Sequence, residues 1–205
     1  MDMHPILRAN AKDSDTVTPN GGTWLTGKLL AAMPVMSDPR FKKALIFMCA
    51  HDANGAMGIV INNEMTNVPI SLLLSQLSVP TGDDFADFPV LQGGPVESAR
   101  GLLLHSADVL KNESIVIDRD YAVTGTVESL REIVAGAGPH DKIFALGYAG
   151  WSAGQLEREI NANAWLTVDA DPDLVFRTPA DQKWDRALRK LGIDPAFLAA
   201  DAGHA

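Results

Sequence analysis

Two apolar segments joined by a turn constrain the fold of this chain more than any other feature. Residues 44–51 (ALIFMCAH) and 56–62 (AMGIVIN) are rich in side chains that favour strands. Between them the chain reads Asp52-Ala-Asn54-Gly55, and Asn-Gly is the sequence that most favours a tight hairpin turn. The pattern predicts a β-hairpin, so part of the fold must be a β-sheet.

The remaining elements mix strands and helices along a chain of 205 residues. Residue type and spacing predict further strands at 24–33, 89–92, 100–106, 114–118 and 165–168, and helices at 70–77, 126–135 and 180–191. The order has no regular βαβ rhythm, which favours an α+β fold over a doubly wound sheet. We expect one domain over 23–196, with a flexible leader at 1–22 and a flexible tail at 197–205.

The chain is acidic, with a formal net charge of −9 and a sequence pI of about 4.9. Proteins that bind nucleic acids usually present a basic face to the phosphates, and the sequence has no basic cluster of that kind. Direct binding to nucleic acid is therefore not expected. The longest apolar run, 44–50, is far shorter than the roughly 18 residues that span a membrane. Since the N-terminus also lacks the apolar core of a secretory signal, we expect a soluble cytoplasmic protein without membrane contact.

Metal and cofactor chemistry has no sequence signature in this chain. The single cysteine, Cys49, excludes an internal disulfide framework and any zinc site built from several cysteines. The sequence has no pair of histidines at metal-binding spacing and no cluster of carboxylates. We therefore expect no metal and no cofactor, and the lone thiol suits a reducing compartment.

The segment 142–157 (KIFALGYAGWSAGQLE) predicts an apolar strand, a glycine-rich turn and a helix that opens at Ser152. The letters G-x-S-x-G around Ser152 are those of a nucleophile elbow, in which such a turn exposes a catalytic serine. Enzymes with that elbow carry their histidine after the serine, and the only histidine downstream is His204, near the C-terminus. Ser152 and Gln155 instead match a capping box, in which each side chain bonds to the backbone of the other residue. A structural turn is the favoured interpretation, and a serine nucleophile is the alternative.

Cys49 and His51 form a second candidate pair. Alternate residues of a strand face the same side, so their spacing predicts that the two side chains share a face. A thiol beside a histidine can act as a nucleophile when it is accessible and ionised. Cys49, however, lies in a wholly apolar run, where a buried and unreactive thiol is the usual outcome. His51 is expected to hold the adjoining turn by a side-chain hydrogen bond.

A glycine-rich turn and a third histidine complete the candidates. In Gln92-Gly93-Gly94-Pro95, successive backbone N–H groups could cradle an anion. Pro95 removes one donor, and no lysine or hydroxyl residue follows as in a phosphate-binding loop, so a tight turn is favoured. His105 follows an apolar run, and we expect a hydrogen-bonded histidine at the edge of the core.

Several segments together resemble the AlgH/YqgE family of bacterial proteins. They are Leu29–Pro34 with Asp38–Phe41, Cys49–His51, Gly55–Asn62, Gly93–Val96, Arg100–His105, Leu146–Glu157, Asn163–Leu166 and Trp184–Asp194. These segments occur in the family's order over about residues 24–195, whereas the leader has no counterpart. The combination is highly specific because it joins many short motifs.

The resemblance implies a fold and leaves the activity open. It implies a single compact α+β domain with a bifurcated sheet, a small barrel-like part and surrounding helices. Members of the family are often labelled as transcriptional regulators linked to alginate production, and no biochemical activity is firmly attached to them. Relatives often carry glycine at the position of Ser152. The family pattern has no helix-turn-helix, so any regulatory role is expected to be indirect.

Two classes of function follow. The leading hypothesis is a non-enzymatic, regulatory or binding protein that engages a protein or small-molecule partner through its turns, where binding residues tend to lie. Its candidate binding residues are Gly93, Gly94, Pro95, His105, Gly147, Gly150 and Trp151. The alternative is a hydrolase or thiol enzyme that uses Ser152 or Cys49 with a histidine, His51 or His105.

Overall fold

The predicted hairpin is the centre of the structure. The computed structural model describes residues 24–82, 87–125 and 127–200. Strands β2 (Leu45–Asp52) and β3 (Gly55–Val60) pair antiparallel from Ile46 opposite Val60 to Asp52 opposite Gly55. Every residue of β3 is buried, and so is every residue of β2 up to its last. The hairpin therefore lies inside the sheet, with other strands on both sides.

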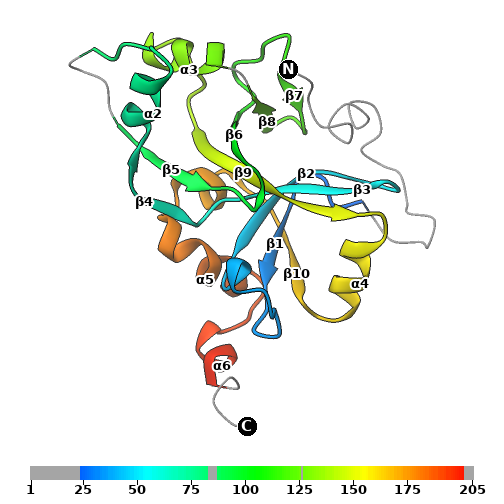
Figure 1. Cartoon of the computed structure of the whole chain (residues 1–205). Helices are drawn as coiled ribbons and strands as arrows, with labels where there is room; N and C mark the ends of the chain where they lie inside the picture. Colours follow the sequence, from blue (N-terminus) through cyan, green and yellow to red (C-terminus); the bar gives the residue numbers. More distant parts are fainter. Residues whose placement is uncertain (1–23, 83–86, 126, 201–205) are drawn as a thin grey trace.

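The other strands extend this hairpin into one mixed sheet (Figure 1). They are β1 (Lys28–Ala32), β4 (Glu64–Pro69), β5 (Pro89–Gln92), β6 (Val96–Ser106), β7 (Ile115–Val116), β8 (Tyr121–Thr124), β9 (Lys142–Ser152) and β10 (Trp165–Asp169). The main path runs in the order β10-β1-β2-β3-β9-β6-β8-β7, and the pair β4-β5 joins it through β9. The strands described pair antiparallel except for β5 and β9, which run parallel.

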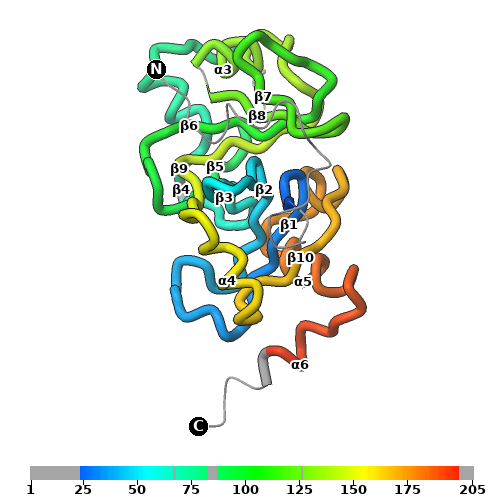
Figure 2. The backbone as a smooth tube through the Cα atoms, turned by 90° about the vertical axis from the view of Figure 1, so that its right-hand side faces the viewer, coloured from blue at the N-terminus to red at the C-terminus, as the bar shows by residue number. Residues whose placement is uncertain are grey.

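Strand β9 divides the sheet into two branches. Its residues 142–148 pair with β6 on one side, and 144–146 pair with β5 on the other. Its last residues, 149–152, pair with β3 instead. Figure 2 shows the result, with the β6-β7-β8 branch above and the β1-β10 branch below. The protein is a single α+β domain with a bifurcated mixed sheet curled into a half-barrel, which confirms the fold that the family resemblance implies.

Glycine allows the turn after β5 to pass close to β9, at a point that we call the branch crossing. Gly147 has φ +72°, a conformation that L side chains rarely adopt, and a Cβ there would lie 2.5 Å from the carbonyl oxygen of Gly94. Gly93 donates its N–H to Leu146 and accepts a hydrogen bond from the N–H of Val60. The turn after β5 is therefore pressed backbone to backbone against β9.

Helices close the faces of the sheet. They are α2 (Ile70–Gln76), α3 (Val127–Val134), α4 (Gln155–Asn161), α5 (Ala180–Lys190) and α6 (Pro195–Ala200), with a 3₁₀ turn η1 (Pro39–Phe41) and a π-helix η2 (Asp173–Arg177). The largest core cluster joins both branches to α5, a second includes Leu156 of α4, and a third lies at α2 and α3. None of the helices in the described ranges is long and apolar enough to cross a membrane.

Several elements differ from the prediction made from the sequence. The first strand starts at Lys28 rather than residue 24, and β9 runs on through the glycines to Ser152, because Ser152 pairs with Gly55 of the hairpin. The helix expected to open at Ser152 therefore begins at Gln155. Strands β4 and β8 carry no strong periodic signal and form by pairing, β4 with β5 and β8 with the longer β6.

The chain ends also bear on the expected domain limits. The leader at 1–22 lies outside the described residues, as do residues 201–205 of the expected tail. The first part of that tail is helical, since α6 extends to Ala200. Leu198 of α6 packs against the largest core cluster, whereas Phe197 is exposed. Figure 2 shows α6 projecting from the body of the domain.

Candidate functional site

Ser152 lies exposed at the end of β9, and its side chain bonds only to its own turn among the described residues. Its hydroxyl and its backbone N–H both donate to Oε1 of Gln155, each at 3.1 Å. This is one half of the predicted capping box. The other half is absent because the N-cap is Gly154, in the left-handed conformation, with no side-chain cap hydrogen bond. Ser152 thus closes the strand, and Gln155 ties the helix back to it.

Cys49 and His51 do not share a face, so that prediction is wrong. The register of β2 with β3 shifts between Met48 and Ala50, which leaves Cys49 as the extra residue of a β-bulge. Cys49 consequently points into the largest core cluster, while His51, opposite Ala56, points to the face covered by α4. A bulge adds one residue to one strand and thereby reverses the alternation that the prediction assumed.

The Cys49 thiol is shielded from solvent. Its side chain is 1% exposed, and its Sγ lies 3.8 Å from the carbonyl oxygen of Phe47. Burial raises the pKa of the Cys49 thiol to about 12. Because the thiolate is the nucleophilic form, this thiol is held in its unreactive state at neutral pH.

His51 is locked between a backbone donor and a carboxylate. Its Nδ1 accepts the N–H of Leu25 at 3.2 Å, so the ring proton lies on Nε2, which donates to Glu157 of α4 at 3.2 Å. The ring also meets the edge of Trp24 with centroids 5.0 Å apart. Burial lowers the pKa of His51, and Glu157 opposes that shift only in part. The histidine fastens α4 and the start of the described chain to β2.

His105 is bonded on both ring nitrogens in the other branch. Nδ1 donates to the carbonyl oxygen of Ser106 at 2.8 Å, and Nε2 accepts from the hydroxyl of Thr124 at 2.9 Å. Thr124 is in turn 2.8 Å from the hydroxyl of Ser114. Burial lowers the pKa of His105. This buried chain of hydrogen bonds ties β6 to β8 at their ends.

The four candidate catalytic residues are separated in space. His105 pairs with Lys142 at the first end of β9, and Ser152 forms the other end, up to about 33 Å away at the usual strand rise. His51 lies in the register row of Trp151, and Ser152, as the next residue, points to the opposite face. Cys49 points into the core. Among the described residues, no hydrogen bond joins Ser152 or Cys49 to a histidine.

The candidate binding residues lie at three separate places. Gly93, Gly94 and Gly147 meet at the branch crossing, and His105 lies apart from them at the far end of β6. Gly150 and Trp151 lie further along β9. The Trp151 ring is buried, and its Nε1 donates to Glu159 of α4 at 2.8 Å.

Glu159 organises the aromatic cluster beneath α4. The same Oε2 that accepts from Trp151 also accepts from Nε1 of Trp165 at 2.8 Å, and Oε1 accepts from Gln155 at 2.9 Å. The two indoles meet edge to face with centroids 6.0 Å apart. Trp151 therefore anchors α4 to the sheet, and its indole N–H is already used within the fold.

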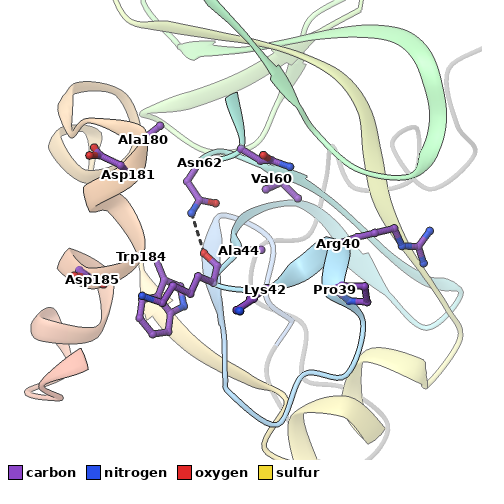
Figure 3. Close-up of a pocket in the computed structure, with 12 residues that line it drawn as sticks. Pro39, Arg40, Lys42, Ala44, Val60, Asn62, Ala180, Asp181, Trp184 and Asp185 are labelled. Atoms are coloured by element: carbon purple, nitrogen blue, oxygen red, sulfur yellow. Dashed lines mark hydrogen bonds between the residues drawn. The ribbon is translucent and has the colours of Figure 1, made fainter. Parts of the chain in front are cut away.

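A cleft of about 370 Å³ lies beside the branch crossing, at residues that the sequence did not single out (Figure 3). It is lined by Pro39, Arg40, Lys42, Lys43, Ala44, Val60, Asn62, Asn63, Ala180, Asp181, Trp184 and Asp185. A shallower depression adjoins it and is lined by Gly94 and Pro95 together with Arg40, Val60 and Asn63, which the two share. The predicted turn residues thus reach the edge of this cleft.

The cleft is formed where three segments meet. The loop that contains η1 (residues 39–44, the η1 loop) supplies one wall. The end of β3 with the residues that follow it (60–63) supplies the floor, and the first turns of α5 supply the other wall. Asn62 fixes the loop, because its Oδ1 accepts the N–H of Leu45 at 2.8 Å and its Nδ2 donates to the carbonyl oxygen of Lys43 at 2.9 Å. Three short, polar segments far apart in sequence carry no common motif, so only the tertiary structure reveals the cleft.

Trp184 and Lys183 hold α5 in place behind the cleft. Trp184 donates its indole N–H to the carbonyl oxygen of Ala32 at 2.9 Å, and the Lys43 ammonium lies 5.0 Å from the centroid of its ring. Lys183 is 4% exposed, and its ammonium donates to the carbonyl oxygens of Ile61 at 2.9 Å and Val175 at 2.7 Å. Burial lowers the pKa of Lys183 to about 8.

Within residues 24–82, 87–125 and 127–200, no three His, Cys, Asp or Glu side chains are grouped closely enough to hold a metal ion. The described carboxylates that bond to other side chains do so mainly with basic residues, as in the pair of Lys190 with Asp171 at 2.6 Å.

Comparisons with known proteins agree on one family. The AlgH-like family model matches residues 29–196. A UPF0301 protein of Methylobacterium nodulans is 48% identical over 97% of this chain and all of its own length. A UPF0301 protein of Bradyrhizobium diazoefficiens is 45% identical over 96% of this chain and 95% of its own.

One solved structure supports the same family, and a second shares the fold. The solution structure of the AlgH protein from Pseudomonas aeruginosa is 35% identical, with a TM-score of 0.71 over 93% of this chain and all of that chain. A crystal structure of a Corynebacterium diphtheriae protein, 18% identical with a TM-score of 0.65 over 92% of this chain and 94% of that one, shares the fold. On the family model and these relatives together, the chain belongs to the AlgH-like family.

Proposed function

We propose that this AlgH-like protein is a non-enzymatic binding protein of the bacterial cytoplasm, with a regulatory role exerted through a small-molecule or protein partner. Its binding site is the cleft between the η1 loop, the end of β3 and α5, extended by the depression at Gly94 and Pro95. The observation that carries the proposal is this cleft, whose volume of about 370 Å³ lies in the range of small-molecule sites.

The arrangement of the reactive side chains supports binding over catalysis. A nucleophile needs a base within hydrogen-bond reach, about 2.6–3.2 Å. Among the described residues, Ser152 bonds to Gln155 and the thiol of Cys49 lies beside a carbonyl group in the core. His51 and His105 have both ring nitrogens engaged in structural hydrogen bonds. The rival function, a hydrolase or thiol enzyme, would need these groups to rearrange.

Regulation by direct operator binding receives no support from the charge. The net charge of −9 opposes approach to DNA over long range. For an acidic protein, regulation through a partner that distinguishes the occupied cleft from the empty one is more consistent with the charge than direct binding to DNA.

Activity-based labelling tests the non-enzymatic part of this proposal. A fluorophosphonate probe for serine and an iodoacetamide probe for cysteine are applied to the folded wild type, Ser152→Ala and Cys49→Ala. We expect no labelling at neutral pH that depends on either residue. Labelling that disappears in Ser152→Ala or Cys49→Ala would overturn the proposal in favour of the rival enzyme.

Native mass spectrometry tests the binding part. Protein purified gently from bacterial cells is expected to carry a small molecule or partner that is lost when the exposed cleft residue Asn63 is enlarged in Asn63→Trp. The matched control is Asn54→Trp, in the exposed hairpin turn away from the cleft. Bare protein in every preparation, or equal retention in Asn63→Trp, would count against a site in this cleft.

A further inference from the structure

We propose that the cleft binds an anion of the phosphate class, a small molecule bearing a diphosphate or similar group, through Lys42 and Lys43. This inference rests on the proposed binding function and adds the chemistry of the ligand. The charged residues around the cleft indicate the chemical class of its ligand.

Basic side chains without an ion pair gather at this cleft. Most described lysines and arginines pair with carboxylates, as expected in a chain with 26 acidic and 17 basic residues. Among the residues the structure describes, the basic side chains without an ion pair are Lys42, Lys43, Lys142, Arg158 and Lys183. Three of these five, Lys42, Lys43 and Lys183, line the cleft or lie directly behind it.

The positions of these groups favour a ligand between the loop and α5. Lys42 and Lys43 are exposed, and the Lys43 ammonium lies over the Trp184 ring on the α5 side. Figure 3 shows Lys42 and Asn62 directed toward the space in front of α5, and Arg40 directed away from it. The Arg40 guanidinium is already occupied by Asp38, with three contacts of 2.6 to 3.1 Å.

The acidic residues of the cleft lie on one of its walls. Asp181 and Asp185 line the cleft from α5, and Figure 3 shows the Asp181 carboxylate directed away from Lys42. Asp185 also lies 4.0 Å from Arg189. The buried Lys183 adds a positive charge behind the floor, where Ile61 lies between the cleft residues Val60 and Asn62, and the nearby Glu64 partly offsets that charge. Among the described lining residues, Lys42 and Lys43 are the cations without an ion pair and Asp181 is the carboxylate without one, so the lining carries a net positive charge.

A phosphate group suits this donor set better than a single carboxylate. The ammonium groups of two consecutive lysines can each meet a different oxygen of a diphosphate, and lysine is a common partner of phosphate groups. Charge-assisted hydrogen bonds of this kind are among the stronger polar contacts. The exposed amide of Asn63, on the same floor, supplies both a donor and an acceptor for the rest of the ligand.

Calorimetric titration with inorganic pyrophosphate tests this assignment on the full-length protein. The key variant is Lys42→Gln/Lys43→Gln, and the matched control is Lys142→Gln/Arg158→Gln, which removes the same charge from unpaired residues outside the cleft. We expect saturable binding to the wild type and the control, at least about tenfold weaker binding to the cleft variant, and weakening of wild-type binding by salt. Citrate, a tricarboxylate, should bind the wild type more weakly.

Other outcomes would overturn the phosphate assignment. These are no saturable pyrophosphate binding by folded wild type, equal weakening in both double variants, or tighter binding of citrate. If pyrophosphate fails while native mass spectrometry finds a molecule that Asn63→Trp loses, the phosphate class falls and the binding function stands. If pyrophosphate binds and Ser152 or Cys49 is labelled, the anion site stands and the non-enzymatic function falls.

Discussion

At the scale of single residues, most groups that looked catalytic have structural roles. His51 and His105 each use one ring nitrogen as a donor and the other as an acceptor, so each connects two elements as a neutral imidazole. Cys49 is held protonated by the core around it. The sequence shows that these residues exist but cannot show what surrounds them, and the surroundings determine reactivity.

Lys183 is a buried charge that local sequence pattern does not predict. The amphipathic pattern of 180–191 predicts a helix, and a lysine in such a helix is ordinarily solvated. In the fold, the Lys183 ammonium donates to the carbonyl oxygens of Ile61 and Val175. It thereby joins α5 to η2 and to the residue that follows β3. Its charge is satisfied by dipoles rather than by an ion pair.

A pH-dependent stability follows from Lys183. Its pKa of about 8 in the folded protein lies below the ordinary value of 10.5, so between these pH values the unfolded chain holds more protons than the folded one. The free energy of unfolding should therefore gain up to about 3 kcal/mol from this group as pH rises from 8 to 10.5. Urea denaturation at several pH values should reveal this gain in the wild type and its loss in Lys183→Met.

The comparison needs a control for the other groups that titrate in this range. Lys142→Met removes a lysine from the start of β9 that makes no ion pair among described residues, and it should keep the wild-type pH dependence. Identical pH dependence in wild type and Lys183→Met would contradict the assigned pKa shift.

At the scale of elements, the prediction from sequence is least accurate at β9. The pattern of its glycines predicts a turn between strand and helix, whereas Gly147 and Gly150 lie within one continuous strand. Gly147 allows the 93–94 backbone to approach, while Gly154 takes the left-handed conformation at the start of α4. Local propensity favours a break at such glycines, and pairing with β3 overrides it.

The close crossing makes Gly147 sensitive to substitution. In Gly147→Ala the new Cβ would lie 2.5 Å from the oxygen of Gly94 in a backbone conformation that alanine disfavours. We expect a loss of about 2–4 kcal/mol in the free energy of unfolding, from strain and displaced backbone together. Chemical denaturation followed by far-UV circular dichroism measures it.

Gly150 supplies the matched control on the same strand. A Cβ there would meet its nearest neighbour, a Tyr148 ring carbon, at 3.6 Å, which is ordinary contact. Gly150→Ala should cost less than about 1 kcal/mol. Equal losses in the two variants would show that the crossing at Gly147 is not as tight as described.

At the scale of the whole molecule, one strand holds the two branches of the sheet together. Strand β9 pairs with β3 in one branch and with β6 in the other. If either branch unfolds, the other therefore loses part of the strand pairing at its border. The largest core cluster also spans both, from Leu29 to Leu104. The domain should therefore unfold in a single step.

The tryptophans allow that expectation to be tested. All four tryptophans (Trp24, Trp151, Trp165 and Trp184) lie in or against the β1-β2-β3-β10 branch, so their fluorescence reports that branch alone. Far-UV circular dichroism reports the backbone of both branches. We expect the two signals to give coincident urea midpoints. A second dichroism transition without a change in fluorescence would show that the β6-β7-β8 branch unfolds independently.

The sequence by itself determined the α+β class, the central hairpin, the helix at α5 and the family, because these depend on local pattern and on the order of short motifs. It could not determine the bulge at Cys49, the continuity of β9, or the cleft formed by the η1 loop, β3 and α5. The continuity of β9 and the cleft arise from contacts between segments separated in the chain, and the bulge arises from the register of β2 with β3; none of these leaves a local signal. The tertiary structure alone decided that Ser152 and the histidines lie apart while Lys42, Lys43 and Lys183 come together.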